Sequence, residues 1–327
     1  MDTSPIPPLS RSNSARTISV KGLFDVVCVM GVVSTGMGFM ASTGWFFELA
    51  SHFRVQLALV LGLLAAGMAL QKRHGAVAVL LMGAVINGGL VLAVARPQPS
   101  PVVSHGVPLR VVSINVHTAN RQHDRVVAYL RETEADLIVA LEVDNRWARA
   151  LEALNDRYPH RVVEARDDNF GIVLLSKKPF VRSQVVDLAG SEVPSIDVTL
   201  DVDGVQVPVL GTHPVPPATP VYAAERNRQL ASIATWAASH SGKAVVLGDL
   251  NTTPWSPYFS RLLADGRLVR AHPRWGVEPT WMADQPWVSL LLDHVLVSPE
   301  IGVTSVEVGP DVGSDHRPVR ADLLMPR

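Results

Sequence analysis

Cysteine is almost absent from this chain of 327 residues, and its single thiol, Cys28, lies within an apolar stretch. One cysteine excludes an intrachain disulfide and a metal site built from several thiolates. The sequence also lacks a glycine-rich phosphate loop of either common type and shows no internal repeat. A disulfide-stabilised fold, a thiolate metal site, a nucleotide-binding glycine loop and a repeat architecture are therefore excluded.

Acidic residues are scarce in the first 105 residues, which hold three of the 30 acids and seven of the 29 bases. The other 27 acids and 22 bases fall in residues 106–327, which are therefore net acidic. Tight, non-specific binding to a phosphate polymer needs many Lys and Arg contacts. The acidic balance of residues 106–327 argues against such binding. The difference in charge between the two parts indicates two differently built regions, and a chain of 327 residues is long enough for two domains.

Three long apolar runs occupy most of the first part, at 23–47, 55–71 and 75–95. Each is close to the ~20 residues that cross a bilayer core. Buried helices of a soluble bundle are the alternative, but such helices usually keep a polar face that these runs lack. A cleaved signal peptide carries a single short apolar core. We therefore expect three transmembrane helices within residues 23–96.

The positions of basic residues predict the orientation of these helices. The bases that flank the runs on one side are Arg11, Arg16, Lys21, Lys72 and Arg73. The positive-inside rule places the N-terminus and the 71–74 loop in the cytoplasm. Three spans then place everything after residue 96 outside the cytoplasm, at the inner membrane if the protein is bacterial.

Two segments outside the apolar runs are expected to lack regular structure. Residues 1–22 are predicted to form a disordered cytoplasmic N-terminus. Residues 97–107 contain three prolines, and a proline-rich segment of this kind forms a stiff, extended linker. The linker is expected to join the membrane helices to a folded domain at 108–327.

Short strand and helix patterns interleave throughout the second part. Expected strands include 109–116, 137–143, 171–176, 195–202, 206–212, 244–247, 289–297 and 319–324, and expected helices are 124–133, 147–156, 223–240 and 257–264. Asp203-Gly204 is a hairpin turn signal. The order lacks a strict β-α-β rhythm. It therefore predicts an α/β (α+β) fold, a four-layer sandwich of two mixed sheets with helices outside.

Polar residues stand at the ends of the first two of these strands. Asn115 ends the first, and Glu142 ends the second, which is otherwise apolar. A carboxylate is costly to bury unpaired, and ligation of Mg²⁺ would offset that cost. The equal alternative is an exposed Glu at a helix N-terminus, before Asp144.

Gly248-Asp249-Leu250-Asn251 follows the buried strand 244–247 and is the strongest single signal. Glycine allows a tight turn, and two residues that are two apart in an extended chain point to the same side. Asp249 could orient and deprotonate water, while Asn251 could donate a hydrogen bond to a phosphoryl oxygen. An Asx turn before the next loop is the structural alternative.

Histidines and further acids complete the set of candidates. His213 follows a strand and could bond a phosphate oxygen, or it could be a surface residue. Asp293 and His294 are neighbours on a strand and face opposite sides, so Asp293 is the candidate and His294 is expected to be structural. Asp315 is expected to orient His316 and raise its basicity.

The sequence allows more than one role for Arg226 and for four tryptophans. Arg226 could reach phosphate from its helix or lie on a solvated helix face. Trp255, Trp275, Trp281 and Trp287 fall in the loop-rich region 254–287. They could stack on a base, meet lipid headgroups or fill the core.

In their order along the chain, these motifs resemble the endonuclease/exonuclease/phosphatase superfamily of Mg²⁺-dependent phosphoesterases. The matching residues are Asn115, Glu142, Asn169-Phe170-Gly171-Ile172, Thr212-His213, Gly248-Asp249-Leu250-Asn251, Leu292-Asp293-His294 and Ser314-Asp315-His316, and they cover 109–324. The superfamily includes abasic-site endonucleases, secreted nucleases, neutral sphingomyelinases and inositol-polyphosphate phosphatases. Leu141 departs from it, because many relatives have Gln there. The long basic or aromatic insertion with which abasic-site nucleases grip DNA is also missing.

The resemblance implies a role for each matching residue. Metal ligands would be Asn115, Glu142 and Asp315, with Mg²⁺ as the cofactor or Mn²⁺ in its place. Asp249 would position the attacking water, Asn251 would stabilise the transition state, His213 and His316 would contact the scissile phosphate, and Asp293 would support His316 or the leaving group. Asn169 and Arg226 are the remaining candidates for phosphate contact.

The expected function is that of a membrane-anchored, metal-dependent phosphoester hydrolase. Its substrate would be a nucleic acid, a nucleotide or a phospholipid, and no obligate protein partner is evident. The alternative is a catalytically silent sensor or scaffold of the same fold that binds a phosphate ligand, which predicts missing catalytic groups. A channel or transporter component is a third reading, but three spans with so few ionisable residues make a poor pathway.

Overall fold

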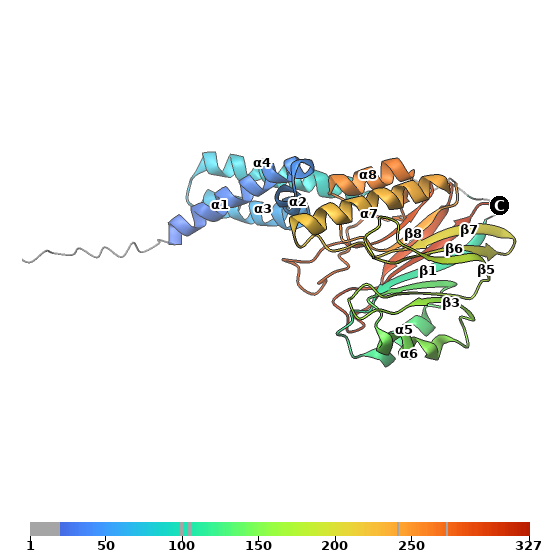
Figure 1. Cartoon of the computed structure of the whole chain (residues 1–327). Helices are drawn as coiled ribbons and strands as arrows, with labels where there is room; N and C mark the ends of the chain where they lie inside the picture. The colour runs from blue at the N-terminus through green and yellow to red at the C-terminus, as the bar shows by residue number, and fades with distance from the viewer. Residues whose placement is uncertain (1–19, 99–100, 102, 104–105, 241, 273) are drawn as a thin grey trace, which may run out of the picture.

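The computed structural model describes residues 20–98, 101, 103, 106–240, 242–272 and 274–327. Figure 1 shows a bundle of helices at the left and a layered α/β sandwich at the right. The expectation of a disordered segment at 1–22 falls almost wholly outside the described residues. Part of the expected linker at 97–107 also lies outside them.

The helical part begins with α1 (Val20–Met37), which continues into the 3₁₀ helix η1 (Gly38–Thr43), and then contains α2 (Trp45–Ser51), α3 (Arg54–Leu70) and α4 (His74–Ala95). The segments Lys21–Thr43 and His74–Ala95 are long and apolar enough to cross a membrane. The helices α2 and α3 meet the same test only as a pair, and their axes differ by 67° at the break between them. The bundle thus offers two straight spans, or three if the bent pair counts as one.

Polar groups inside the bundle are paired with one another. Asn87 donates a hydrogen bond to Thr35 Oγ1 at 2.8 Å and accepts one from Arg54 at 3.0 Å, and all three side chains are buried. Cross-helix hydrogen bonds of this kind are how helices packed in an apolar environment satisfy a polar side chain. Around them pack apolar residues from α1, α3 and α4, among them Leu61 and Leu80.

The second part contains two six-stranded mixed sheets, which confirms the expected α/β sandwich. In order, the first sheet contains β11 (Gly302–Val308), β12 (Val319–Met325), β1 (Val107–Asn115), β2 (Leu137–Leu141), β4 (Ile172–Ser176) and β3 (His160–Glu164). The second contains β5 (Phe180–Val186), β6 (Ser195–Val202), β7 (Val205–Gly211), β8 (Val245–Asp249), β10 (Asp293–Val297) and β9 (Val269–Arg270).

Helices cover the outer face of each sheet. The first sheet packs against α5 (His123–Glu132), α6 (Asn145–Leu151) and the 3₁₀ helix η2 (Glu152–Leu154), and the second packs against α7 (Pro220–Ser239) and α8 (Pro257–Gly266). In Figure 1, α7 and α8 lie above the sheets and α5 and α6 lie below them.

The alternation of side chains along β2 explains why this strand is apolar throughout. Leu137, Val139 and Leu141 point into the core between the two sheets, whereas Ile138 and Ala140 point toward α5 and α6. Successive side chains of a strand face opposite ways, so a strand covered on both sides needs no polar position. The Asp203-Gly204 turn joins β6 to β7 as an antiparallel hairpin, as expected.

Several strands differ from the sequence prediction. The strands β3, β5, β9 and β11 were not expected, and all lie at sheet edges. Edge strands are half exposed, so their polar and apolar residues mix and the pattern is weak. The strand expected at 289–297 begins only at Asp293, because Leu290 turns away to pair with Trp281.

Candidate active site

The two sheets bring their functional residues together at one end of the sandwich. The strands β1 and β2 are parallel neighbours, as are β7 and β8, so their carboxyl ends meet there. Asn115 and Asp249 end β1 and β8, and Glu142 directly follows β2. The strand β10 runs antiparallel to β8 and begins at this end, with Asp293 opposite Asp249.

A buried cluster of acids and imidazoles forms at this end. His316 Nδ1 lies 2.8 Å from Asp293 Oδ2, and His316 Nε2 lies 3.6 Å from Asp249 Oδ2. His213 approaches the same oxygen from the other side, with Nε2 at 3.5 Å. One oxygen of Asp249 therefore faces two imidazoles, and all four side chains are nearly excluded from solvent.

The charges in this cluster stabilise one another. Burial alone would lower the pKa of His316, but the Asp293 and Asp249 carboxylates raise that pKa to about 10. Burial would raise the pKa of Asp249, yet the neighbouring His316 and His213 hold it below its ordinary value. Asp249 is therefore ionised and His316 is a cation near neutral pH.

Asp249, Asp293 and His316 each offer one ligand atom, and these atoms lie within 4.8 Å of one another. A metal ion could bind such a group. Both nitrogens of His316 face carboxylate oxygens, whereas Asp293 Oδ1 and His213 Nδ1 are buried without a hydrogen-bond partner. His316 therefore satisfies only part of this polar cluster.

Glu142 provides a second place for a cation. Asn115 Nδ2 lies 2.8 Å from Glu142 Oε1 and 3.4 Å from Asp249 Oδ2, so a donor bridges two carboxylates there. The amide of Thr118 donates to Glu142 Oε2 at 3.3 Å. Carboxylate oxygens are ligands that Mg²⁺ prefers, and Glu142 and Asp315 bring two carboxylates into one pocket, so this pair fits that ion, whereas Asn115 presents its amide nitrogen to Glu142.

Asp315 lies in the same pocket but does not orient His316, contrary to the sequence prediction. Its Oδ1 lies 2.7 Å from His117 Nδ1, and its Oδ2 accepts a hydrogen bond from Trp281 Nε1 at 3.0 Å. Adjacent residues in this turn point in different directions, so Asp315 and His316 take different partners. The carboxylate that orients His316 is Asp293.

Four residues that line or adjoin the pocket have left-handed backbone conformations. His117, Glu142, Asn169 and Asn251 all have positive φ angles, between 48° and 67°. Such angles are uncommon for residues other than glycine and often mark functional sites, where the surrounding fold holds them in place. In Glu142, this conformation lies directly after a fully buried strand.

The turn after β8 forms the Asx turn and also places Asp249 and Asn251 in the pocket, so both alternatives for this motif hold. Asn251 N donates to Asp249 Oδ1 at 2.9 Å, which is the Asx turn considered as an alternative. Both side chains nevertheless line the pocket, and Asn251 Nδ2 is held by the carbonyl of Pro214 at 2.9 Å. Gly248 is required here, because a Cβ at that position would collide with the carbonyl of Thr212.

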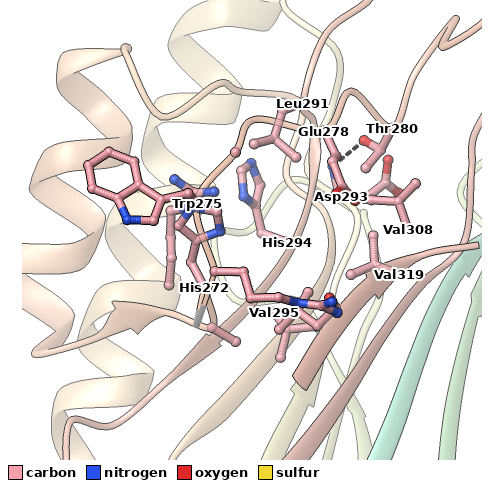
Figure 2. Close-up of a pocket in the computed structure, with 15 residues that line it drawn as sticks. His272, Trp275, Glu278, Thr280, Leu291, Asp293, His294, Val295, Val308 and Val319 are labelled. Atoms are coloured by element: carbon pink, nitrogen blue, oxygen red, sulfur yellow. Dashed lines mark hydrogen bonds between the residues drawn. The ribbon is translucent and has the colours of Figure 1, made fainter. Parts of the chain in front are cut away.

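His294 is structural, as its place on the opposite face of β10 predicts. Its Nε2 lies 3.0 Å from the carbonyl of Thr252, and its ring packs on Phe259. Figure 2 shows His294 among the residues that line a second pocket, between Trp275 and Asp293. This pocket has a volume of about 70 Å³. That volume is too small for most ligands.

Arg226 lies elsewhere than expected. Its side chain is fully buried and forms a salt bridge with both carboxylate oxygens of Glu48, at 2.6 and 2.7 Å. It also donates to the carbonyl of Asn251 at 2.6 Å. The guanidinium therefore neither contacts the pocket nor lies on a solvated helix face, because α2 covers this part of α7. Asn169, in contrast, is exposed and lines the pocket.

The pocket itself has a volume of about 490 Å³, a size typical of small-molecule sites. It is lined by Glu142, Asn169, His213, Asp249, Asn251, Asp315 and His316, and by Leu49, His52 and Phe53 from the corner between α2 and α3. The contribution of the helical part was not predicted. The signal for it was Glu48, one of only three acids in the first 105 residues, which needs a partner when buried.

Comparison with known proteins identifies a related family. The family model described as Endonuclease/Exonuclease/phosphatase family matches residues 112–316. No curated protein gives a match. The structure of an endonuclease/exonuclease/phosphatase from Beutenbergia cavernae has 26% identity and a TM-score of 0.55, and the match covers 67% of this chain and 72% of that one.

Two further structures show the same fold at lower identity. Sphingomyelinase C from Streptomyces griseocarneus is 24% identical with a TM-score of 0.50, and the match covers 66% of this chain and 99% of the sphingomyelinase. The 3′ phosphatase NExo from Neisseria, solved with a product DNA hairpin, is 21% identical with a TM-score of 0.54, and the match covers 65% of this chain and 98% of NExo.

Proposed function

The chain belongs to the endonuclease/exonuclease/phosphatase family, and we propose that it is a membrane-anchored phosphoester hydrolase that depends on Mg²⁺ or Mn²⁺. The observation that carries this proposal is the shared oxygen of Asp249. It faces His213 and His316 within one pocket, beside Glu142. A carboxylate of this kind orients a water molecule, while the imidazoles bind the phosphoryl group that the water attacks.

In this mechanism the water held by Asp249 forms a new bond to phosphorus. The ester bond on the opposite side breaks, the attacking water loses one proton to solvent, and the leaving oxygen takes up one proton to become an alcohol, so that one water is added across the ester bond. His316 donates to a phosphoryl oxygen and is held in place by Asp293. His213 donates from the other side, and its buried position keeps bulk water away from the reacting group.

Asn251 and Asn169 are the remaining polar groups that face the substrate space. In this proposal the Asn251 amide helps to stabilise the charge that grows on the phosphoryl oxygens. Asn169 contacts phosphate from the exposed side of the pocket. Glu142, Asp315 and Asn115 would hold the metal ion, which when bound would neutralise negative charge on the substrate.

Membrane anchoring is supported by the surface of the helical part. Large apolar side chains that face outward from α1, α3 and α4 include Val29, Met30, Leu63, Met82 and Val85, each at least 60% exposed. Exposed apolar belts on this scale mark contact with a membrane or a partner. We propose that α1 and α4 cross the bilayer, that α3 crosses it between them, and that α2, bent by 67° from α3, lies on the sandwich outside the cytoplasm.

The experiment that tests the hydrolase function uses the purified full chain in detergent with Mg²⁺ or Mn²⁺ and the soluble diester bis(p-nitrophenyl) phosphate. We expect metal-dependent hydrolysis and a loss of about 100-fold or more in Asp249→Asn. Asp265→Asn, at an exposed position on α8, is the matched control and should keep full activity. Equal activity in Asp249→Asn and the wild type would rule out the assigned role.

A further inference from the structure

One wall of the active-site pocket comes from the membrane-proximal helices. Leu49, His52 and Phe53, at the corner between α2 and α3, line the same cavity as Asp249 and His316. Six further lining residues are apolar: Phe170, Pro216, Pro217, Ala218, Leu290 and Leu292. Pro217 and Leu290 adjoin the helical corner, since Trp45 donates to the carbonyl of Pro217 and Gln56 to that of Ser289. The wall at the helices is therefore mostly apolar, and the candidate catalytic groups form the polar end of the pocket.

The charges of the pocket are unsuited to a polyanion. Its described lining contains four carboxylates, those of Glu142, Asp168, Asp249 and Asp315, and contains neither Lys nor Arg. Proteins that bind a nucleic acid strand follow its backbone with a positively charged groove. A substrate with a single phosphoester and an apolar body fits this lining better than a polynucleotide does.

The helical corner is fixed to the sandwich by several direct contacts. Glu48 accepts a hydrogen bond from Ser256 at 2.6 Å in addition to its salt bridge with Arg226. Trp45 donates to the carbonyl of Pro217 at 2.6 Å, and Gln56 donates to that of Ser289 at 2.8 Å. The pocket therefore has a set position relative to the apolar helices.

Two exposed tryptophans of the sandwich lie next to contacts with the helical part, one at the corner between α2 and α3 and the other at the end of α4. Trp287, 63% exposed, follows Pro286, whose carbonyl accepts a hydrogen bond from Gln56. Trp275, 66% exposed, precedes Gly276, which donates to the carbonyl of Ala95 at the end of α4. Exposed tryptophans at the ends of apolar helices are typical of the membrane–water interface.

From this arrangement we infer that the substrate is a phosphoester borne by a membrane lipid. Its phosphate enters the polar end of the pocket, and its apolar chains pass Leu49 and Phe53 toward the bilayer. Water adds to phosphorus, the ester bond on the opposite side breaks, and the released oxygen is protonated, so that a lipid diester yields a monoester and an alcohol. This inference rests on the proposed hydrolase function.

The test uses the full chain reconstituted in vesicles with Mg²⁺. Separate arms supply phosphatidylglycerol as a phosphodiester lipid, phosphatidic acid as a phosphomonoester lipid, a single-stranded oligonucleotide, and soluble bis(p-nitrophenyl) phosphate as the reporter of hydrolase function. The two lipid arms distinguish the kind of ester that is cleaved. We expect release of product from at least one lipid at a higher kcat/KM than from the oligonucleotide.

Variants of the wall test whether the helical corner selects the lipid. In the Leu49→Ala/Phe53→Ala double variant, the ratio of lipid kcat/KM to reporter kcat/KM should fall roughly tenfold, since apolar contacts to the chains are lost. Leu59→Ala is the control for Leu49→Ala: it removes the same atoms as that change from an outward-facing position on α3, 59% exposed, and should leave the ratio unchanged.

The outcomes separate this inference from the proposed function. Hydrolysis of the reporter and the oligonucleotide without hydrolysis of either lipid would overturn the inference and leave the hydrolase function standing. An unchanged ratio in the double variant would overturn the role of the helical corner. Absence of hydrolysis of all four substrates by the wild type would overturn the proposed function, and the inference with it.

Discussion

Glu48 on α2 and Arg226 on α7 form a salt bridge that is completely buried, although 178 residues separate them in the chain. The same guanidinium donates a hydrogen bond to the carbonyl of Asn251, two residues after Asp249. A single side chain, that of Arg226, thus links an acid of the helical part to the turn that carries the candidate catalytic carboxylate. This contact makes the helices part of the active-site structure.

Loss of Arg226 should destabilise the protein. Arg226→Met leaves Glu48 buried without a cation, and breaking a buried ion pair in this way costs about 3–5 kcal/mol. The control is Arg228→Met, two residues along the same helix, where the arginine is exposed and pairs with Glu225; its loss should cost less than about 1 kcal/mol. The free energy of unfolding, measured with denaturant in detergent, checks both. Equal values for the two variants would contradict the structure.

Asp293→Asn should reduce activity by weakening the orientation of His316. The carboxylate holds His316 Nδ1 at 2.8 Å, and loss of such a supporting group commonly lowers activity by about 10- to 100-fold. Steady-state hydrolysis of a soluble diester measures the effect, with Asp284→Asn as the exposed control. A fully active Asp293→Asn variant would show that His316 does not need this partner.

Glu142→Gln should weaken metal binding. Replacing a carboxylate with an amide removes the negative charge that a divalent cation needs, and we expect the Mg²⁺ concentration for half-maximal thermal stabilisation to rise about tenfold or more. Melting curves recorded over a range of Mg²⁺ after treatment with a chelator give this value independently of activity. Glu152→Gln, at an exposed site, is the control. The assignment of Glu142 fails if the two variants respond to Mg²⁺ alike.

The proposed topology predicts how external protease acts on intact cells. A sandwich outside the cytoplasm should be cleaved when protease is added to spheroplasts, whereas a tag placed at the N-terminus should be protected until lysis. Immunoblots for the tag and the C-terminus report both ends. Protection of the sandwich before lysis, with cleavage after it, would invert the orientation.

Much of the candidate site could be predicted from polar residues at the ends of apolar strands. A buried apolar run followed by a polar residue, as at Glu142 and Asp249, predicts both a strand and the end at which it stops. Parallel pairing then brings those ends together, as it does for β1 with β2 and β7 with β8. The proximity of these residues followed from that pattern, and the two-sheet sandwich followed from strands and helices that interleave without a strict β-α-β rhythm.

The contacts that the sequence did not predict are those set by tertiary packing. Asp315 was expected to orient the adjacent His316, but its partner is His117, which depends on how two turns meet. The support of His316 by Asp293, in contrast, was expected from the family resemblance. Arg226 could not be placed without knowledge of Glu48. The edge strands were missed because their half-exposed residues give no regular pattern.

The central claim is that a water molecule attacks phosphorus in this pocket, and hydrolysis in ¹⁸O-labelled water tests it most directly. The full chain, Mg²⁺ and bis(p-nitrophenyl) phosphate are combined, and both products are analysed by mass spectrometry. We predict that the label appears in p-nitrophenyl phosphate and is absent from p-nitrophenol, and that Asp249→Asn forms neither product above background. Label in p-nitrophenol, or labelled phosphate formed equally by Asp249→Asn, would contradict the account.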